Sequence, residues 1–328
     1  MKRSVLVLVI LMLVGGMLFA AAGREGGAAG ELGNYPSKPI TCVVPYAPGG
    51  GTDLFVRTLL RYANPKLRHP IAVVNVDGAA GFIGAMQVYH GSNDGYTILA
   101  HNGMDLVVFT LSGRTDLKLW QEFVPICWAV TDYQGVFTSS QSGFRTIDEL
   151  VAHARANPGT MTYGTVGART MNNLNATQIL EGLGLSGLVR LVPYDGGAQI
   201  RTAILGGHIQ MAQASLGDFG PAIQSGDLRP LLLVSPRRTN LAPDVPTTGE
   251  RGMPRATTLI PRGFYGPPGM NPAQARFLEG VFKEAVENPE FVADITKAFT
   301  DAFFVSAADV FKQSEEAFSI LAPLWENF

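Results

Sequence analysis

The chain has 328 residues, of which 46% are hydrophobic and 16% are charged, and its formal net charge is -2. This length predicts roughly two domains with ordinary hydrophobic cores. The small and nearly balanced charge argues against a protein that binds nucleic acid or a membrane surface.

The N-terminus has the pattern of a secretory signal. Lys2 and Arg3 precede an apolar stretch from residue 5 to residue 19, and the three alanines 20–22 supply small residues for cleavage before Gly23. The apolar stretch is short for a membrane-spanning helix, which favours cleavage over the alternative of a membrane anchor. We therefore expect residues 1–22 to be a signal peptide and residues 23–34 a flexible segment. The mature protein is expected to be exported, without stable membrane insertion and without a cysteine near the cleavage site to carry a lipid.

The first element of the mature chain is the apolar strand 40–44, which leads into the glycine-rich turn 45–53. A helix is expected to begin there, near Thr52 or Asp53. Glycines let the backbone approach a ligand closely, and the unpaired N–H groups at a helix start attract an anion. The turn has no Lys followed by Ser or Thr, which argues against a nucleotide P-loop. It therefore predicts either an ordinary strand–helix turn or a loop that binds a small carboxylate.

The remaining apolar segments alternate between strand-like and helix-like patterns, which predicts βαβ units and mostly parallel sheets. The expected strands are 71–75, 97–100, 124–130, 135–138, 161–164, 189–193, 209–214, 231–235 and a return strand with its turn at 264–268. The expected helices are 53–62, 82–89, 147–156, 198–205, 272–287 and 307–321, with a further helix that starts near Thr170 or Met171. Thr146 and Glu149 form a capping box at the start of helix 147–156. This order favours two similar lobes, the second inserted into the first.

An ordered set of motifs resembles the substrate-binding proteins of tripartite tricarboxylate transporters, the Bug family. The motifs are residues 35–40, 43–53, 78–84, 94–97, 157–159, 163–165, 192–198, 243–247 and 266–269. The resemblance covers nearly all of the mature chain. It implies an α/β fold of the class II periplasmic-binding-protein type, a two-lobed clamshell with the ligand cleft between the lobes. It also implies capture of a small organic acid, such as a di- or tricarboxylate, and delivery to the large and small membrane subunits of a permease driven by an ion gradient.

On this basis we expect lobe I to comprise residues 35–130 and 262–328, and lobe II residues 131–261. The chain is expected to cross between the lobes near 130–134 and near 258–264, and to be a monomer without a cofactor or a metal. A sensory binding protein that docks on a receptor and a secreted enzyme that acts on organic acids are the alternatives. Enzyme activity is disfavoured because the five histidines lack metal-ligand spacing and residues 213–217 lack the first glycine of a nucleophile elbow. No G-x-G-x-x-G follows a strand, so a dinucleotide is not expected.

The expected ligand site combines two glycine-rich helix starts, one from each lobe. The candidates in lobe I are Tyr46, Pro48, Gly49, Gly50, Gly51, Thr52, Asp53, Gly78, Ala79, His101 and Asn102. The candidates in lobe II are Gly164, Thr165, Arg169, Thr170, Tyr194 and Asp218.

Several of these residues have a structural alternative. Arg169 departs from the Gly- and Ser-rich run that the resemblance implies, and is either a surface residue or a bidentate clamp on a second ligand carboxylate. Asp218, where the resemblance implies an acidic residue facing the cleft, either accepts a hydrogen bond from a ligand hydroxyl or amino group or caps the short helix before Pro221. The Asp53 side chain is expected to bind backbone donors or a water, and to pair with Arg57 at the i,i+4 spacing.

The second glycine turn, 78–81, either faces the ligand or allows close packing of the backbone. The aromatic candidates Tyr46, Tyr194 and Phe264, and also His101, either contact the ligand or pack in the core. Cys42 and Cys127 are the only cysteines. They could pair in an oxidising compartment, but both lie in apolar strand-like runs, which favours two free buried thiols.

Overall fold

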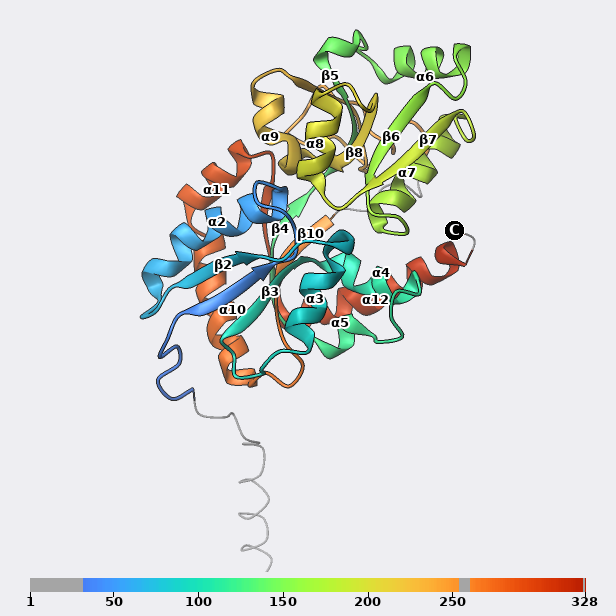
Figure 1. Cartoon of the computed structure of the whole chain (residues 1–328). Coiled ribbons are helices and arrows are strands. Elements are labelled where there is room, and N and C mark those ends of the chain that lie inside the picture. Colours follow the sequence, from blue (N-terminus) through green and yellow to red (C-terminus); the bar gives the residue numbers. More distant parts are fainter. Residues whose placement is uncertain (1–31, 254–259, 327) are drawn as a thin grey trace, which may run out of the picture. The chain divides into compact units, whose positions relative to one another are not determined.

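Two mixed sheets, each covered by helices, organise the chain (Figure 1). The computed structural model describes residues 32–253, 260–326 and 328. The predicted signal peptide, 1–22, and residues 23–31 of the predicted flexible segment lie outside the described residues.

The first sheet has the strand order β11-β4-β10-β3-β1-β2. Its strands are β1 (Ile40–Val44), β2 (Ile71–Asn75), β3 (Thr97–Asn102), β4 (Val124–Asp132), β10 (Ile260–Gly266) and β11 (Asp301–Ser306). β1 pairs in parallel with β2 and β3, whereas β10 lies antiparallel between β3 and β4, and β11 is antiparallel to β4. The turn after β1 and the turn after β3 therefore emerge at the same edge of the sheet.

Helices cover both faces of this sheet, and side chains of β10 pack against both layers of helices. One layer contains α2 (Gly51–Ala63), η1 (Asn64–Lys66), α10 (Pro272–Val286) and α11 (Pro289–Lys297). The other contains η2 (Ala79–Gly81), α3 (Phe82–Tyr89), α4 (Gly103–Leu111), α5 (Leu119–Glu122) and α12 (Ala307–Trp325). Phe264 stacks on Phe282 of α10 with ring centroids 4.1 Å apart, while the next residue, Tyr265, belongs to the core under α4 and α12. Successive side chains of a strand point to opposite faces, so both layers are fixed by the same strand.

The second sheet has the strand order β7-β6-β8-β5-β9. Its strands are β5 (Gln134–Ser139), β6 (Met161–Val166), β7 (Val189–Tyr194), β8 (Met211–Ser215) and β9 (Leu228–Leu233), and its helices are η3 (Ser140–Ser142), α6 (Ile147–Ala156), α7 (Met171–Gly182), α8 (Gly197–Leu205) and α9 (Leu216–Gln224). β6 is parallel to β7 and β8, and β5 is antiparallel to β8 and β9. The capping box that the sequence predicts for Thr146 and Glu149 is present at the start of α6.

The chain passes from the first sheet to the second through Tyr133, which separates β4 from β5. It is back in the first sheet at β10, after residues 254–259, which lie outside the described residues. Asp132, Gln134 and β10 are therefore close to the crossings between the two sheets. The lobe boundaries predicted from the sequence, 130/131 and 261/262, remain a proposal. The division of the strands between the two sheets supports it.

Several details differ from the sequence prediction. Both sheets are mixed, whereas mostly parallel sheets were expected, because β4, β5, β10 and β11 make antiparallel pairs. α4, α5, α11 and β11 were not predicted, and α9 continues through Pro221 instead of ending before it. Cys42 and Cys127 are free and fully buried, as the alternative of two separate thiols predicts. Within the described residues, every helix is too short or too polar to cross a membrane.

Candidate functional site: a polar cavity between two helix N-termini

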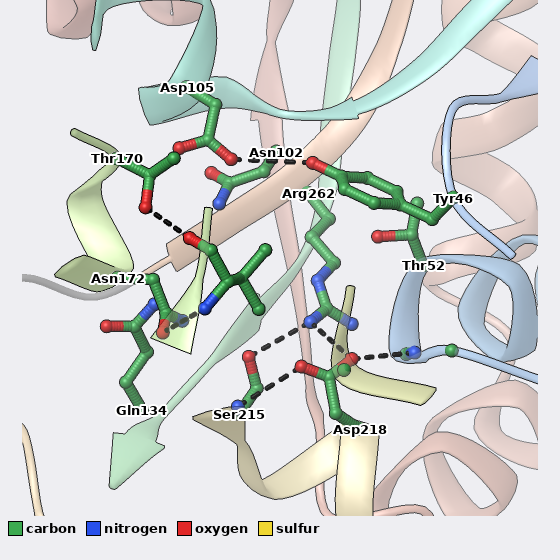
Figure 2. Close-up of a pocket in the computed structure, with 14 residues that line it drawn as sticks. Tyr46, Thr52, Asn102, Asp105, Gln134, Thr170, Asn172, Ser215, Asp218 and Arg262 are labelled. Carbon is green, nitrogen blue, oxygen red and sulfur yellow. Dashed lines mark hydrogen bonds and ion pairs between the residues drawn. The ribbon is translucent and has the colours of Figure 1, made fainter. Parts of the chain in front are cut away.

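A polar cavity lies between the two lobes, close to the chain crossings (Figure 2). It is lined by Tyr46, Gly50, Gly51, Thr52, Asn102, Asp105, Gln134, Val166, Thr170, Asn172, Gly197, Ser215, Asp218 and Arg262. The volume open to the centres of water molecules is about 40 Å³. A single water needs roughly 10–15 Å³ by this measure, so the cavity has space for a few waters.

Asp218 of α9 places its carboxylate on the N-terminus of α2. Its Oδ1 accepts a hydrogen bond from the backbone N–H of Gly51 at 2.7 Å, and its Oδ2 accepts one from the N–H of Ser215 at 3.2 Å. Gly51 is the first residue of α2, where unpaired N–H groups and the helix dipole favour an anion. A carboxylate from the second lobe therefore occupies the position that the glycine turn predicts for a ligand carboxylate.

Arg262 of β10 carries the central positive charge of the cavity. Its Nη2 lies 3.3 Å from Asp218 Oδ1 and 3.0 Å from Ser215 Oγ, and its Nη1 lies 3.2 Å from Asp132 Oδ2. The guanidinium is buried, and burial alone would lower its pKa, but Asp218 and Asp132 raise it. Burial raises the pKa of Asp132 to about 7 although Arg262 opposes this. A buried arginine between two carboxylates is thus held charged at the crossing of the chain.

Asp105 presents a second buried carboxylate to the cavity from the first turn of α4. It is 6% exposed, and the Tyr46 hydroxyl donates to its Oδ2 at 3.4 Å. Burial raises the pKa of Asp105 to about 7, while Tyr46, Arg114, Arg262 and the backbone N–H of Met171 act to lower it. Met171 is the first residue of α7. Each lobe therefore offers a carboxylate to a helix N-terminus of the other.

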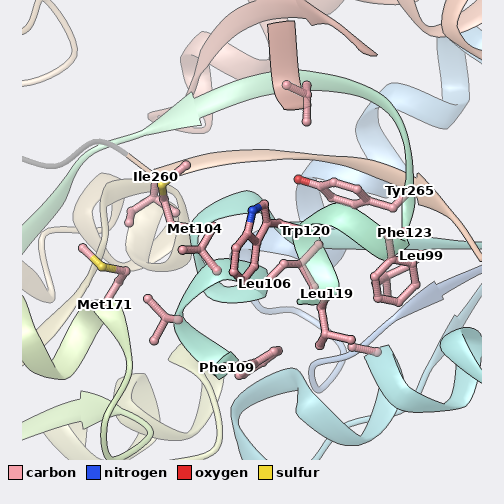
Figure 3. Close-up of a cluster of buried hydrophobic side chains, with 14 of the residues drawn as sticks. Leu99, Met104, Leu106, Phe109, Leu119, Trp120, Phe123, Met171, Ile260 and Tyr265 are labelled. Atoms are coloured by element: carbon pink, nitrogen blue, oxygen red, sulfur yellow. The ribbon is translucent and has the colours of Figure 1, made fainter. Parts of the chain in front are cut away.

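The packing of α7 explains why its N-terminus reaches Asp105. Met171 lies in the hydrophobic core of the first lobe with Leu106, Phe109 and Ile260, although its helix covers the second sheet (Figure 3). Met104, on the turn of α4 that carries Asp105, belongs to the same core. The apolar contact thus holds the start of α7 against the start of α4.

Two arginines outside the lining also connect the lobes. Arg114 donates from Nη1 to the carbonyl oxygen of Ala79 at 2.5 Å and from Nη2 to that of Ala168 at 2.9 Å. Arg201 donates from Nη1 to the carbonyl oxygens of Asp218 at 2.7 Å and Gly49 at 3.3 Å. Each guanidinium is therefore committed to backbone oxygens from both lobes.

The profile of the family described as "Tripartite tricarboxylate transporter family receptor" matches residues 55–324. The chain belongs to this receptor family. Its members are binding proteins for transporters, which agrees with the resemblance found in the motifs.

Individual receptors of this kind are similar over most of the chain. The chain is 27% identical over 300 residues to the protein BugT of Bordetella pertussis, with 91% of the chain and 88% of BugT covered. The structure of the periplasmic binding protein BugD matches with a TM-score of 0.83 at 24% identity, covering 89% of the chain and 98% of BugD. The structure of MatC from Rhodopseudomonas palustris with bound malate matches with a TM-score of 0.81 at 19% identity, covering 89% of the chain and 100% of MatC. These structural matches show the two-lobed α/β fold.

In this receptor, part of the predicted ligand set comes together at the cavity. The predicted residues that line it are Tyr46, Gly50, Gly51, Thr52, Asn102, Thr170 and Asp218. The predicted residues outside the lining are Pro48, Gly49, Asp53, Gly78, Ala79, His101, Gly164, Thr165, Arg169 and Tyr194. Ligand contact by any of them remains a prediction.

The residues outside the lining have structural partners of their own or face solvent. The side chain of Asp53 accepts hydrogen bonds from the N–H of Gly49 and from Arg57 Nε, both at 2.9 Å, which agrees with the expected backbone contact and i,i+4 pair. Burial lowers the pKa of His101 to about 4, and its Nδ1 lies 2.9 Å from the carbonyl oxygen of Asn102. Arg169 is exposed and has a φ of 53°, which fits its surface alternative.

The cavity also contains residues that the sequence prediction missed. They are Asp105, Gln134, Val166, Asn172, Gly197, Ser215 and Arg262. Asp105 and Arg262 did give a signal, since each is a charged residue in an otherwise apolar segment, a rare placement for an unpaired charge. Asn172 and Gln134 gave none, because polar amides next to turns are common.

The buried carboxylates predict an unusual pH dependence of stability for the unliganded receptor. In the folded state the pKa values of Asp105 and Asp132 are about 7, above the ordinary value of 3.8. Between about pH 4 and pH 7 these two groups bind more protons in the folded state, so the free energy of unfolding should fall as the pH rises. His101 has the opposite effect on stability between about pH 4 and pH 6.5. Its pKa is lowered to about 4, so in this range it binds fewer protons in the folded state than in the unfolded state.

The free energy of unfolding, measured with urea, should therefore fall as the pH is raised from about 5 to 8. Asp105→Asn should make this dependence of stability on pH weaker. A stability that rises across this range in the unchanged protein would contradict the burial of ionisable Asp105 and Asp132 described above.

Proposed function

We propose that this receptor is a periplasmic solute-binding protein that captures a small organic acid in the cavity and delivers it to an ion-gradient-driven tripartite permease. The observation that carries the proposal is the pair of helix N-termini, of α2 and α7, that face one polar cavity. Gly51 at the start of α2 binds a carboxylate of the protein itself at 2.7 Å, so the position is suited to a carboxylate. The malate in the structure of MatC supports an organic acid as the ligand class.

Neutral donors from both lobes are available for a ligand carboxylate. Asn102 uses its Oδ1 to accept from the N–H of Met104 at 3.1 Å, and Asn172 uses its Oδ1 to accept from the N–H of Val166 at 3.1 Å. Among the described residues, neither Nδ2 group donates a hydrogen bond to a partner. Both amide nitrogens are therefore free to donate to a ligand, as is the hydroxyl of Thr52 at the start of α2.

Binding requires the lobes to separate and close again. An open volume of about 40 Å³ is too small for a dicarboxylate, so a ligand must displace waters and separate contacts such as that of Asp218 with Gly51. Closure then brings donors of both lobes onto the ligand, the hinge motion common in proteins of this architecture. The receptor performs no chemistry on the ligand in this scheme.

Calorimetry and thermal unfolding with a panel of mono-, di- and tricarboxylates and amino acids test this proposal. We expect one-to-one binding of at least one acid, which at 100 times its Kd should stabilise the receptor by about 2.7 kcal/mol. Asn172→Ala should weaken binding about tenfold through loss of a hydrogen bond to a charged group. Asn240→Ala, the same change at an exposed position of the second lobe outside the cavity lining, is the matched control and should leave affinity unchanged.

Absence of binding by every acid would contradict the proposal, and so would turnover of an acid, followed by NMR of the ligand. An equal loss in Asn172→Ala and Asn240→Ala would show that the loss does not come from a ligand contact in the cavity.

A further inference from the structure

The charged groups of the cavity have an excess of carboxylates. Of the described residues that line it, Asp105 and Asp218 are acidic and Arg262 is the one cation. A third carboxylate, that of Asp132, lies 3.2 Å from Arg262 Nη1. The single guanidinium is thus shared by two carboxylates before any ligand enters.

No second cation of the described part of the chain is free to meet a further ligand carboxylate in the cavity. Arg114 and Arg201 direct their guanidinium groups at backbone carbonyl oxygens, with shortest distances of 2.5 Å to Ala79 and 2.7 Å to Asp218. His101 is fully buried, and with a pKa of about 4 it is neutral at pH 7. A dicarboxylate could place one carboxylate on neutral donors, but the other would face carboxylates of the protein.

Asp105 is the carboxylate that lacks a cation. It is 6% exposed, and within the described residues it takes part in no ion pair, in contrast to Asp132 and Asp218. Its hydrogen-bonding partners are neutral groups, the hydroxyl of Tyr46 at 3.4 Å and the backbone N–H of Met171. Removing a carboxylate from water without a counter-charge is costly, so a cation that entered the cavity would be most strongly favoured beside Asp105.

The arrangement of neutral and acidic groups matches a ligand with charges of both signs. Thr52, Asn102 and Asn172 supply donors for one carboxylate, and Asp105 with Tyr46 supplies acceptors for a positively charged nitrogen. Thr52, Asn102 and Asn172 line the same cavity as Asp105, so both ends of a small zwitterion can be reached at once (Figure 2).

We propose that the cavity selects an organic acid that also carries a cationic nitrogen, such as an amino acid, and that Asp105 is the residue that pairs with this nitrogen. The proposal rests on the proposed function, because it narrows the class of acid without changing the role of the receptor. It makes Asp105 a determinant of specificity, whereas Asp218 and Asp132 neutralise Arg262.

Matched pairs of acids that differ only in an amino group test the proposal. Suitable pairs are succinate and aspartate, propanoate and alanine, hexanoate and 6-aminohexanoate, and 3-phenylpropanoate and phenylalanine. By calorimetry we expect the aminated member of the best-fitting pair to bind at least tenfold more tightly, which corresponds to about 1.4 kcal/mol. Asp105→Asn should reduce this ratio to below about threefold, while Asp244→Asn, at an exposed position, should preserve it.

Thermal unfolding of Asp105→Asn establishes that the variant is folded before its affinities are compared. Equal or tighter binding of the plain acid in every pair would overturn the inference and leave the proposed function intact. A preference for the aminated member that survives Asp105→Asn would overturn the role of Asp105. Binding of none of the mono-, di- or tricarboxylates, aminated or plain, would contradict the proposed function itself.

Discussion

Replacing Arg262 by methionine is expected to destabilise the unliganded receptor by about 3–5 kcal/mol at pH 7, measured by urea unfolding. The guanidinium lies 3.2 Å from Asp132 and 3.3 Å from Asp218 and is 4% exposed. Methionine has a similar length but no charge, so both carboxylates would lose their counter-ion in a buried place. The penalty should become smaller toward pH 5, because protonation removes the unpaired charge of Asp132.

Arg238→Met is the matched control, because Arg238 pairs with Glu250 at 2.8 Å on the surface, where both side chains are more than 40% exposed. Breaking an exposed pair of this kind costs about 0–1 kcal/mol. Adding Asp132→Asn and Asp218→Asn to Arg262→Met should recover most of the lost stability, because the triple variant also lacks the two carboxylates that Arg262 neutralises. If Arg262→Met costs no more than Arg238→Met, the buried cluster does not contribute the stability inferred from its geometry.

Gly263→Ala should destabilise the receptor by about 3 kcal/mol, the upper end of the usual range for an overpacked site. The register of β10 against β4 shifts between Arg262 and Gly263, as at a β-bulge. A Cβ on Gly263 would lie 2.7 Å from the Cα of Trp128 and closer still to the carbonyl oxygen of Cys127. Both obstacles are backbone atoms of the neighbouring strand, so relief requires β10 and β4 to move apart.

The same irregularity affects the site, because bulges re-aim the side chains next to them. Gly263→Ala should therefore also lower ligand affinity through misplacement of Arg262. Gly280→Ala is the control: Gly280 lies in α10 with nothing within 4 Å of the added Cβ. Alanine should stabilise that helix by up to about 1 kcal/mol. A Gly263→Ala protein as stable as the unchanged one would show that the strands tolerate the extra methyl group.

The fold was largely predictable because its elements carry local signals. The strands β1 and β2 and the helix α3 are uniform apolar or amphipathic segments, and their predicted bounds match the structure. α4 was missed because Gly103–Leu111 is apolar apart from Asp105 and Thr110, and such a segment gives little helical periodicity. The antiparallel return of β10 depends on contacts with β3 and β4, which are far away in the sequence.

The site was less predictable, because it depends on which distant segments meet. The glycine turn before α2 indicated an anion-binding helix start, and Gly51 does bind a carboxylate, but this comes from Asp218, 167 residues further along the chain. Arg169, the arginine that the sequence singled out, is exposed, whereas Arg262 lies in the cavity because β10 returns to the crossing. Neither the charge pairing of Arg262 nor the lack of a counter-ion at Asp105 could be inferred from local sequence.

The two cysteines make the receptor suitable for site-directed labelling. Cys42 and Cys127 are both 0% exposed, and burial raises the pKa of each thiol, so the reactive thiolate is scarce and inaccessible to reagents. A cysteine introduced at an exposed position such as Arg169 would therefore be the site where a thiol-specific fluorophore attaches. A dye at that position, next to the N-terminus of α7, would change its surroundings as the lobes open and close. The receptor could thus be converted into an optical reporter of its own ligand without removal of either natural cysteine.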